Sequence, residues 1–440
     1  MSSPETTTEG LEKKRATPYL SMAGAWALAF GCAVGWGAFV MPGNTFLPIA
    51  GPVGTAIGIG IGAVIMLLLA LNYHFLMNRF SGSGGTYTYT KECFGYDHGF
   101  LSAWFLVLTY IAIIWANATA LPLIARTLLG STFQFGFLYE IAGFQVYMGE
   151  VLLAVCALIV AALLTLRRKA AEWTQILMAV LLFGGIVVCF VVATGAADAT
   201  TAFSPSYSPA NSPAGGVLTI FALTPWAFVG FESISHSTQE ANFPLKRTFP
   251  IMGAAVVCAA VAYSLLAMLA TTALPEGCGS WVDYVANLGS YQGTSALPTF
   301  FASFSAWGNT GLVVLGIAAL CGIFTGLIGN YIALSRLLCA LSEDDMIPGR
   351  IGELDKHRVP RRAILCILGV SVLLPFFGRT AISWIVDVTT VGATIAYAFF
   401  PAGDHRLPHA AAGWARDNPC DPRVRQREDR RHLADGVQLG

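Results

Sequence analysis

The chain has 440 residues, of which 55% are hydrophobic and 11% charged, and its formal net charge is zero. A soluble domain usually carries about 25% charged residues, so the composition excludes an ordinary soluble protein and predicts an integral membrane protein. The balanced charge predicts no nucleic-acid partner.

Residues 1–21 are polar and end in a basic cluster, Lys13 to Arg15, ahead of the first apolar run. Because no cleavage site follows a short apolar core, this segment is expected to be a retained cytoplasmic N-terminus rather than a signal peptide. A membrane span needs about 20 largely apolar residues. By this measure residues 22–400 form a transmembrane core of ten spans, at 22–42, 53–79, 99–125, 149–166, 172–194, 216–236, 250–273, 310–334, 362–378 and 381–400.

The distribution of Lys and Arg orients these spans. With the N-terminus inside, the inner segments up to residue 400 hold sixteen basic residues: Lys13, Lys14, Arg15, Arg79, Lys91, Arg167, Arg168, Lys169, Lys246, Arg247, Arg336, Arg350, Lys356, Arg358, Arg361 and Arg362. The outer segments hold two, Arg126 and Arg379. This positive-inside bias predicts a multi-pass protein with a cytoplasmic N-terminus. The short loops and the lack of sorting motifs suggest the inner membrane of a bacterium.

Two spans contain residues that weaken helices. Span one reads "GCAVGWGAFVMPG" from Gly31 to Gly43, and span six carries Pro225 and Gly230 beside Glu232. Irregular backbone at membrane depth survives only where it lines a cavity or is buried in protein. The two spans are five apart, and because five is odd, repeats of five helices would be inserted upside down relative to each other. Interrupted helices at matching positions of inverted halves indicate the binding site of a transporter.

Free peptide groups at such breaks suit a zwitterion. Amides at the start of one half-helix attract a carboxylate, and carbonyls at the end of another attract an ammonium group. An amino acid carries both. Each feature alone also fits a purely structural role, since glycines allow close helix packing and a proline can simply kink a helix.

Four segments, in order, resemble the amino acid–polyamine–organocation (APC) transporter superfamily. They are "GWGAFVMPG" in span one, "SGSGGTYTYTKECFG" from Ser81, "WAFVGFES…EANFPLKRTFP" from Trp226, and "ALSRLLCALSEDDMIP" from Ala333. The resemblance covers about residues 20–400. It implies an all-α integral membrane fold of two inverted five-helix repeats, with discontinuous helices 1 and 6. It also implies a permease for amino acids or related amines, working by symport or exchange, and leaves a homodimer open.

The resemblance also implies roles for particular residues. The expected substrate-binding residues are Gly35, Trp36, Gly37, Trp226, Phe228 and Phe231. Glu232 matches the carboxylate of span six that helps to close the inner path. The chain departs from the family at Trp36, where many members have a small polar residue, and in span five, where some proton-coupled members have a lysine. The substrate, the coupling proton and the exchanged amino acid therefore stay open.

Buried polar residues add to this picture. An ionisable residue within a span usually faces a cavity or a partner, so Glu232 is the first candidate for gating or proton coupling. A structural hydrogen bond to a neighbouring helix is the alternative. Asn117 in span three can reach the pocket, although ordinary interhelical hydrogen bonding is the favoured explanation for it. The ten cysteines contain no CxxC pair, and no disulfide, metal site or cofactor is expected.

The character of the chain changes after Phe400. Residues 401–440 contain seven Arg, three His and no Lys or apolar span. They form either a basic tail or a segment translated out of frame, and truncation would then give an exchanger that has lost activity. A channel or an intramembrane enzyme is the remaining alternative, but the chain has no filter repeat, H-E-x-x-H motif or G-x-S-x-G elbow.

Overall fold

Apolar side chains cover the outside of the molecule. The computed structural model describes residues 18–80, 82, 84–141, 143–197, 202–356, 358–378, 385, 388–389 and 391–395. Within them, seven helices are long and apolar enough to cross a membrane. On one such helix, α8 (Arg168–Ala196), Leu177 and Val191 expose 61% and 60% of their surface, while Ala179 and Ile186 are buried. Exposed apolar residues of this kind fit a lipid environment.

The predicted spans have helical counterparts through the ninth. In chain order these are α2 (Met22–Ala33) with α3 (Gly37–Met41), α4 (Leu47–Arg79), α6 (Tyr96–Leu129), α7 (Met148–Thr165), α8, α9 (Pro213–Phe228) with the 3₁₀ helix η3 (Phe231–Glu240), α10 (Thr248–Leu269), α13 (Asn309–Glu343), and α14 (Arg361–Ser371) with η7 (Leu374–Phe377). Span ten is described only at residues 385, 388–389 and 391–395. The N-terminal 17 residues and the tail at 401–440 lie outside the described residues.

The first span is longer than its predicted end at residue 42. A single turn of π-helix, η1 (Pro42–Phe46), joins α3 to α4, so the helix continues to Ala50. The chain then turns at Gly51, whose φ of +73° and close contact with the backbone of Tyr207 exclude a larger residue. Span two runs from this turn to Arg79.

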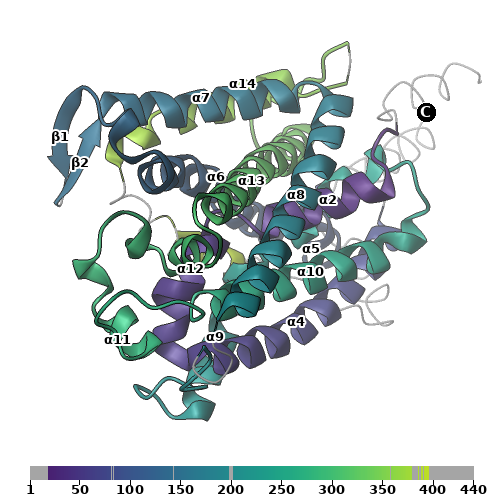
Figure 1. The fold of residues 1–440 in the computed structure, drawn as a ribbon. Helices are drawn as coiled ribbons and strands as arrows, with labels where there is room; N and C mark the ends of the chain where they lie inside the picture. Colours follow the sequence, from purple (N-terminus) through teal and green to yellow (C-terminus); the bar gives the residue numbers. More distant parts are fainter. Residues whose placement is uncertain are drawn as a thin grey trace, which may run out of the picture.

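Helix packing follows the inverted-repeat relation. Exchanging the two halves maps the contact of α2 with α10 onto that of α9 with α4, and both pairs pack together. It maps the contact of α13 with α8 onto that of α6 with span ten, where a side chain at Gly392 would meet Thr109 of α6. Figure 1 shows α2, α6 and α13 enclosed by the other long helices. This packing agrees with the predicted all-α fold of two inverted repeats.

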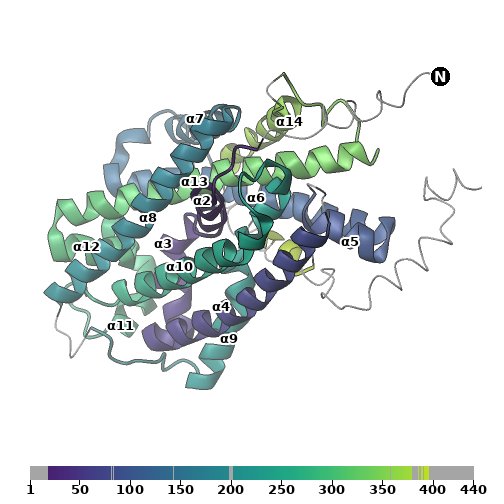
Figure 2. The same ribbon diagram turned by 90° about the vertical axis from the view of Figure 1, so that its right-hand side faces the viewer.

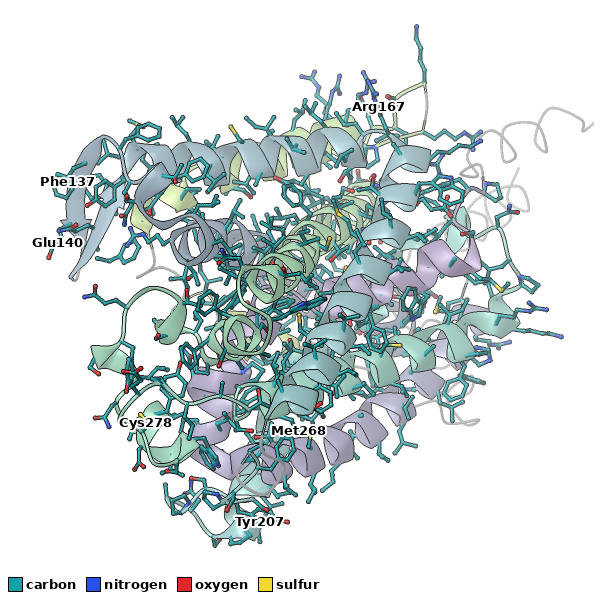
Figure 3. The ribbon with its side chains drawn as sticks, in the orientation of Figure 1. Phe137, Glu140, Arg167, Tyr207, Met268 and Cys278 are labelled. Carbon is teal, nitrogen blue, oxygen red and sulfur yellow. The ribbon has the colours of Figure 1, made fainter. Side chains whose placement is uncertain are left out.

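Short elements fill the connections at the two ends of the molecule. They are α5 (Thr86–Phe94), η2 (Gly130–Phe133), the antiparallel strands β1 (Phe137–Ile141) and β2 (Phe144–Tyr147), η4 (Leu245–Arg247), α11 (Trp281–Ala286), η5 (Leu288–Ser290), η6 (Gly293–Ala296) and α12 (Pro298–Trp307). Figure 2 places α5 at the opposite end from α11 and α12. Figure 3 likewise shows Phe137 and Glu140 of the hairpin far from Arg167. We call the end with Arg167, α5 and η4 the basic end, and the end with the hairpin, α11 and α12 the outer end.

Candidate functional site

The first helix break lies between α2 and α3. Val34 leaves the helical region at φ −113° and ψ 83°, and its N–H closes the last turn of α2 on the Phe30 carbonyl at 3.0 Å. Side chains from other helices bind the freed backbone. The Ala33 carbonyl accepts a hydrogen bond from the Tyr263 hydroxyl at 3.3 Å, and the Trp36 N–H donates to Asn117 Oδ1 at 3.2 Å. Other helices therefore stabilise this opening in the middle of span one.

The second break lies between α9 and η3. Pro225 removes one N–H from the last turn of α9, and Gly230 adopts φ +106°, a conformation that favours glycine. The two breaks touch, because a Cβ atom at Gly230 would lie 2.6 Å from Cβ of Cys32. The predicted interruptions of spans one and six are therefore present and adjacent.

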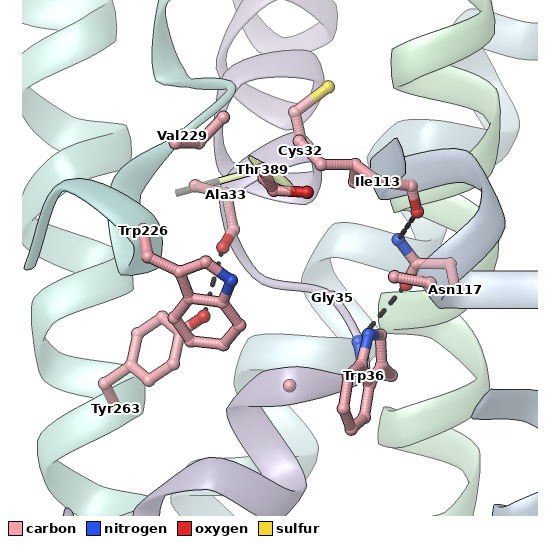
Figure 4. Close-up of a pocket in the computed structure, with 12 residues that line it drawn as sticks. Cys32, Ala33, Gly35, Trp36, Ile113, Asn117, Trp226, Val229, Tyr263 and Thr389 are labelled. Atoms are coloured by element: carbon pink, nitrogen blue, oxygen red, sulfur yellow. Dashed lines mark hydrogen bonds between the residues drawn. The ribbon is translucent and has the colours of Figure 1, made fainter. Parts of the chain in front are cut away.

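A cavity lies at the junction of the two breaks (Figure 4). The volume open to the centres of water molecules is about 40 Å³. A single water needs about 10–15 Å³ by this measure, so the cavity takes only a few waters or a small ligand. Its lining residues are Cys32, Ala33, Gly35, Trp36, Gly37, Ile113, Ala116, Asn117, Trp226, Val229, Tyr263 and Thr389.

Five of the eight predicted site residues meet at this cavity. They are Gly35, Trp36, Gly37, Asn117 and Trp226. Trp226 lies against the span-one break, since a Cβ atom at Gly37 would be 2.5 Å from Cη2 of its indole. On its other side, the indole makes an edge contact with the Tyr263 ring at a centroid distance of 6.4 Å.

Phe228, Phe231 and Glu232 do not line the cavity. Phe228 and Phe231 are fully buried, and Phe231 packs its edge on Tyr73 at 5.7 Å. Helix geometry accounts for the position of Phe228, because two residues after Trp226 it points about 200° around the axis. Val229, three residues after Trp226, returns to the same side and lines the cavity.

Asn117 binds the backbone of the span-one break. Its Nδ2 donates to the Ile113 carbonyl at 2.9 Å, which directs Oδ1 toward the Trp36 amide. Ile113 and Ala116 of α6 also line the cavity, and the position of Ile113 follows from its spacing of four residues from Asn117. Tyr263 and Thr389 were not anticipated, and the apolar runs around them give no signal in the sequence.

Glu232 lies beside the cavity, at the start of η3. Its Oε2 accepts the Gly230 N–H at 2.9 Å, and its Oε1 accepts the Tyr110 hydroxyl at 3.0 Å. Glu232 has 1% exposure and Tyr110 is fully buried. The carboxylate thus caps the second half of the broken span six.

A buried ion-pair network lies at the basic end. Glu240, at the end of η3, accepts hydrogen bonds at 3.0 Å from Arg336 of α13 and from Arg168 of α8. The Glu240 carbonyl also accepts the backbone amides of Tyr19 and Leu20, each at 2.9 Å. These hydrogen bonds hold the segment before α2 against the end of η3.

Comparison with known proteins places the chain in a family. The model of the amino acid permease family matches residues 20–403, which is most of the chain. The chain belongs to this family. It is therefore an APC-superfamily membrane transporter and not an enzyme.

Relatives and a solved structure agree with this assignment. The chain is 23% identical to the branched-chain amino acid permease BcaP of Lactococcus lactis over 87% of its own length and 80% of that protein. It is 24% identical to the vacuolar cationic amino acid transporter 2 of Arabidopsis thaliana (84% and 56%), and 25% identical to the methylthioribose transporter of Bacillus subtilis (73% and 66%). A Na⁺-coupled sialic acid symporter has the same fold, with a TM-score of 0.58, 15% identity, and coverage of 86% of this chain and 78% of the symporter.

Proposed function

We propose that this permease carries an amino acid or a related amine across the membrane by alternating access, with the substrate held where the two helix breaks meet. The observation that carries the proposal is the cavity between Gly35–Gly37 and Trp226–Val229, at the contact of the two interrupted spans. Where a helix is unwound, its backbone N–H and C=O groups can bind the substrate, so the site needs no charged side chain of the protein.

The polarity of the breaks suits a zwitterion. The helical segment from Gly37 to Ala50 begins at the cavity, so its first amides and positive dipole end face a substrate carboxylate. The ends of α2 and α9 bring carbonyl groups to the same place. The Trp226 ring adds a surface for the ammonium group through a cation–π contact. An amino acid carboxylate and ammonium thus have separate, complementary positions.

The size of the cavity favours a small substrate. Trp36 and Trp226 both occupy its lining, and about 40 Å³ is left between them. Two of the three named relatives are a branched-chain amino acid permease and a cationic amino acid transporter. We infer a substrate of the same chemical class with a shorter side chain.

The orientation of the protein in the membrane follows from its distribution of Lys and Arg residues. The basic end is the cytoplasmic end under the positive-inside rule, and the location is the cell membrane, most simply the inner membrane of a bacterium. The network of Glu240, Arg336 and Arg168 then closes the cytoplasmic side in this conformation, and the cavity opens to the cytoplasm when the network is released.

The proposal is tested by uptake into proteoliposomes containing the full chain. A panel of labelled amino acids and amines is offered with a pH gradient, with unlabelled amino acid inside, or with neither. Uptake driven by the gradient indicates symport, and uptake driven by internal substrate indicates exchange. A folded, purified chain that moves no member of the panel under any condition would refute the proposed function.

A further inference from the structure

A second polar cluster lies one turn beyond the cavity. The Tyr110 hydroxyl of α6 is 3.0 Å from Glu232 Oε1 and 2.9 Å from Nε2 of His236, both on η3. All three side chains are buried, with exposures of 0% for Tyr110 and His236 and 1% for Glu232. The Tyr110 and His236 rings meet edge to face at 5.4 Å. The sequence had pointed to Glu232 alone.

One hydroxyl proton cannot serve both neighbours. Tyr110 donates to either the carboxylate or the imidazole, and the other contact needs a proton from the partner. With Glu232 ionised, the complete arrangement is His236 Nε2–H to Tyr110 Oη, and Tyr110 O–H to Glu232 Oε1. The three groups therefore form a directed hydrogen-bond chain.

The chain joins the substrate cavity to the basic end. At one end, Glu232 Oε2 holds the Gly230 amide, next to cavity-lining Val229. At the other end, His236 lies against the segment before α5, since a Cβ atom at Gly85 would be 2.8 Å from its Nδ1. Thr238 ties η3 to the same segment through the Gly82 carbonyl at 3.1 Å.

Few charged groups surround these three side chains in the part of the chain that the structure describes. From α4 and α2, Tyr73 and Cys32 come within electrostatic range of Glu232, and both are neutral phenol or thiol groups. Tyr89 of α5 packs on Tyr73, and Tyr263 of α10 bonds to Ala33. At the far end of η3, Glu240 pairs with both Arg336 of α13 and Arg168 of α8, so this cluster carries one net positive charge. None of these three charged side chains is hydrogen-bonded to His236, which contacts Tyr110.

We propose that His236, Tyr110 and Glu232 form a proton relay that couples substrate movement to a proton, an inference that rests on the proposed transport function. When the basic end opens, a proton reaches the buried Nδ1 of His236 and gives an imidazolium. The imidazolium passes its Nε2 proton to Tyr110 Oη as Tyr110 passes its own proton to Glu232 Oε1. Tyr110 is unchanged, His236 ends neutral with its proton on Nδ1, and Glu232 ends as a neutral carboxylic acid.

Protonation alters the contact that holds the second break. A neutral Glu232 accepts the Gly230 amide more weakly than a carboxylate does, because hydrogen bonds to charged groups are about twice as strong. The break beside the cavity is then freer to rearrange. Proton arrival at His236 and movement at the substrate site are linked in this way.

The test compares proton-driven uptake with substrate exchange in proteoliposomes of the full chain. Exchange of labelled for unlabelled substrate measures binding and movement without net proton flux, whereas pH-gradient uptake and an internal pH dye report coupling. His236→Gln retains an amide donor but cannot carry a proton. Tyr110→Phe retains the ring contact and lacks the hydroxyl. His74→Gln is the matched control, because this partly buried histidine on α4 bonds to Thr248 outside the relay.

Both relay variants are expected to keep exchange and lose stimulation by the pH gradient, while His74→Gln keeps both. Relay variants that match the wild type in gradient-driven uptake would overturn the inference and assign the cluster a structural role. A wild type that exchanges substrate without any response to pH would also overturn it, yet leave the proposed transport intact. Failure of uptake and exchange together would remove the proposed function and the relay with it.

Discussion

In the proposed transport site, Trp226 is the side chain expected to contact the substrate most directly. It lies between the span-one break and Tyr263 and forms one wall of the cavity. Replacement by alanine removes the aromatic surface, and an aromatic–cation contact contributes about 2 kcal/mol or more when shielded from water. We expect Trp226→Ala to lower kcat/KM for uptake about tenfold or more.

Phe301 is the matched control for this substitution. It lies on α12 at the outer end, where it packs against Tyr284 at 5.8 Å, so it is ordered but remote from the cavity. Phe301→Ala is expected to change stability and leave kcat/KM nearly unaltered. Equal losses of transport in the two variants would mean that the substrate site has been placed wrongly.

The substitution Gly37→Ala is a second test of the proposed site, because it adds a single carbon atom there. An added Cβ would lie 2.5 Å from the Trp226 indole, so Gly37→Ala must displace that ring. Gly60 of α4 has open space around its Cβ position, and alanine there should stabilise the helix by up to about 1 kcal/mol. We expect Gly37→Ala to abolish or strongly impair uptake and Gly60→Ala to preserve it, with both proteins reaching the membrane in similar amounts.

At the scale of elements, the interruptions of spans one and six followed from their glycine and proline residues. The sequence predicted the breaks because residues that weaken a helix at membrane depth are tolerated mainly where the backbone lines a cavity or is buried in protein. It did not predict that η3 would be a 3₁₀ helix, or that the connections would contain the β1–β2 hairpin, α11 and α12. The connecting segments contain no apolar run long enough for a membrane span, and their order comes from tertiary contacts such as Arg126 against Phe144 at 4.4 Å.

The end of η3 is stabilised by a buried ion pair. Glu240 and Arg336 each have 5% exposure, and removing one member of a buried pair typically costs about 3–5 kcal/mol. Glu240→Gln should therefore lower the thermal unfolding midpoint in detergent clearly. The control is Glu353→Gln, because Glu353 pairs with Arg362 at an exposed site, where such pairs contribute about 1 kcal/mol or less. A similar small shift in both variants would contradict a structural role for the buried network.

At the scale of the whole molecule, the fold was predictable from the spacing of apolar runs and the charge bias, while the composition of the site was not. An odd offset between two broken spans is enough to require inverted halves. The cavity is assembled from α2, α3, α6, α9, α10 and span ten, so its members are neighbours only after folding. Tyr263 and Thr389 sit in apolar runs that resemble lipid-facing helix, which is why pattern alone could not select them.

Alternating access predicts that closure at the basic end controls the cavity from a distance. Glu240 fastens α8, α13 and the segment before α2 to the end of η3, whose other end meets the span-one break at Cys32. Releasing that network should favour the conformation open to the basic end. The substitution destabilises only the closed conformation, which contains the network, and the equilibrium therefore shifts toward the open one.

The test uses a protein that keeps only Cys32 among its ten cysteines. An impermeant thiol reagent supplied from the basic end should label Cys32 faster in the Glu240→Gln variant than in the protein with the native network. Glu353→Gln should label at the unmodified rate, and a saturating substrate from the uptake panel should slow labelling in each case, since Cys32 lines the cavity. Labelling that is insensitive to both Glu240 and substrate would mean that the basic-end network and the cavity are not coupled.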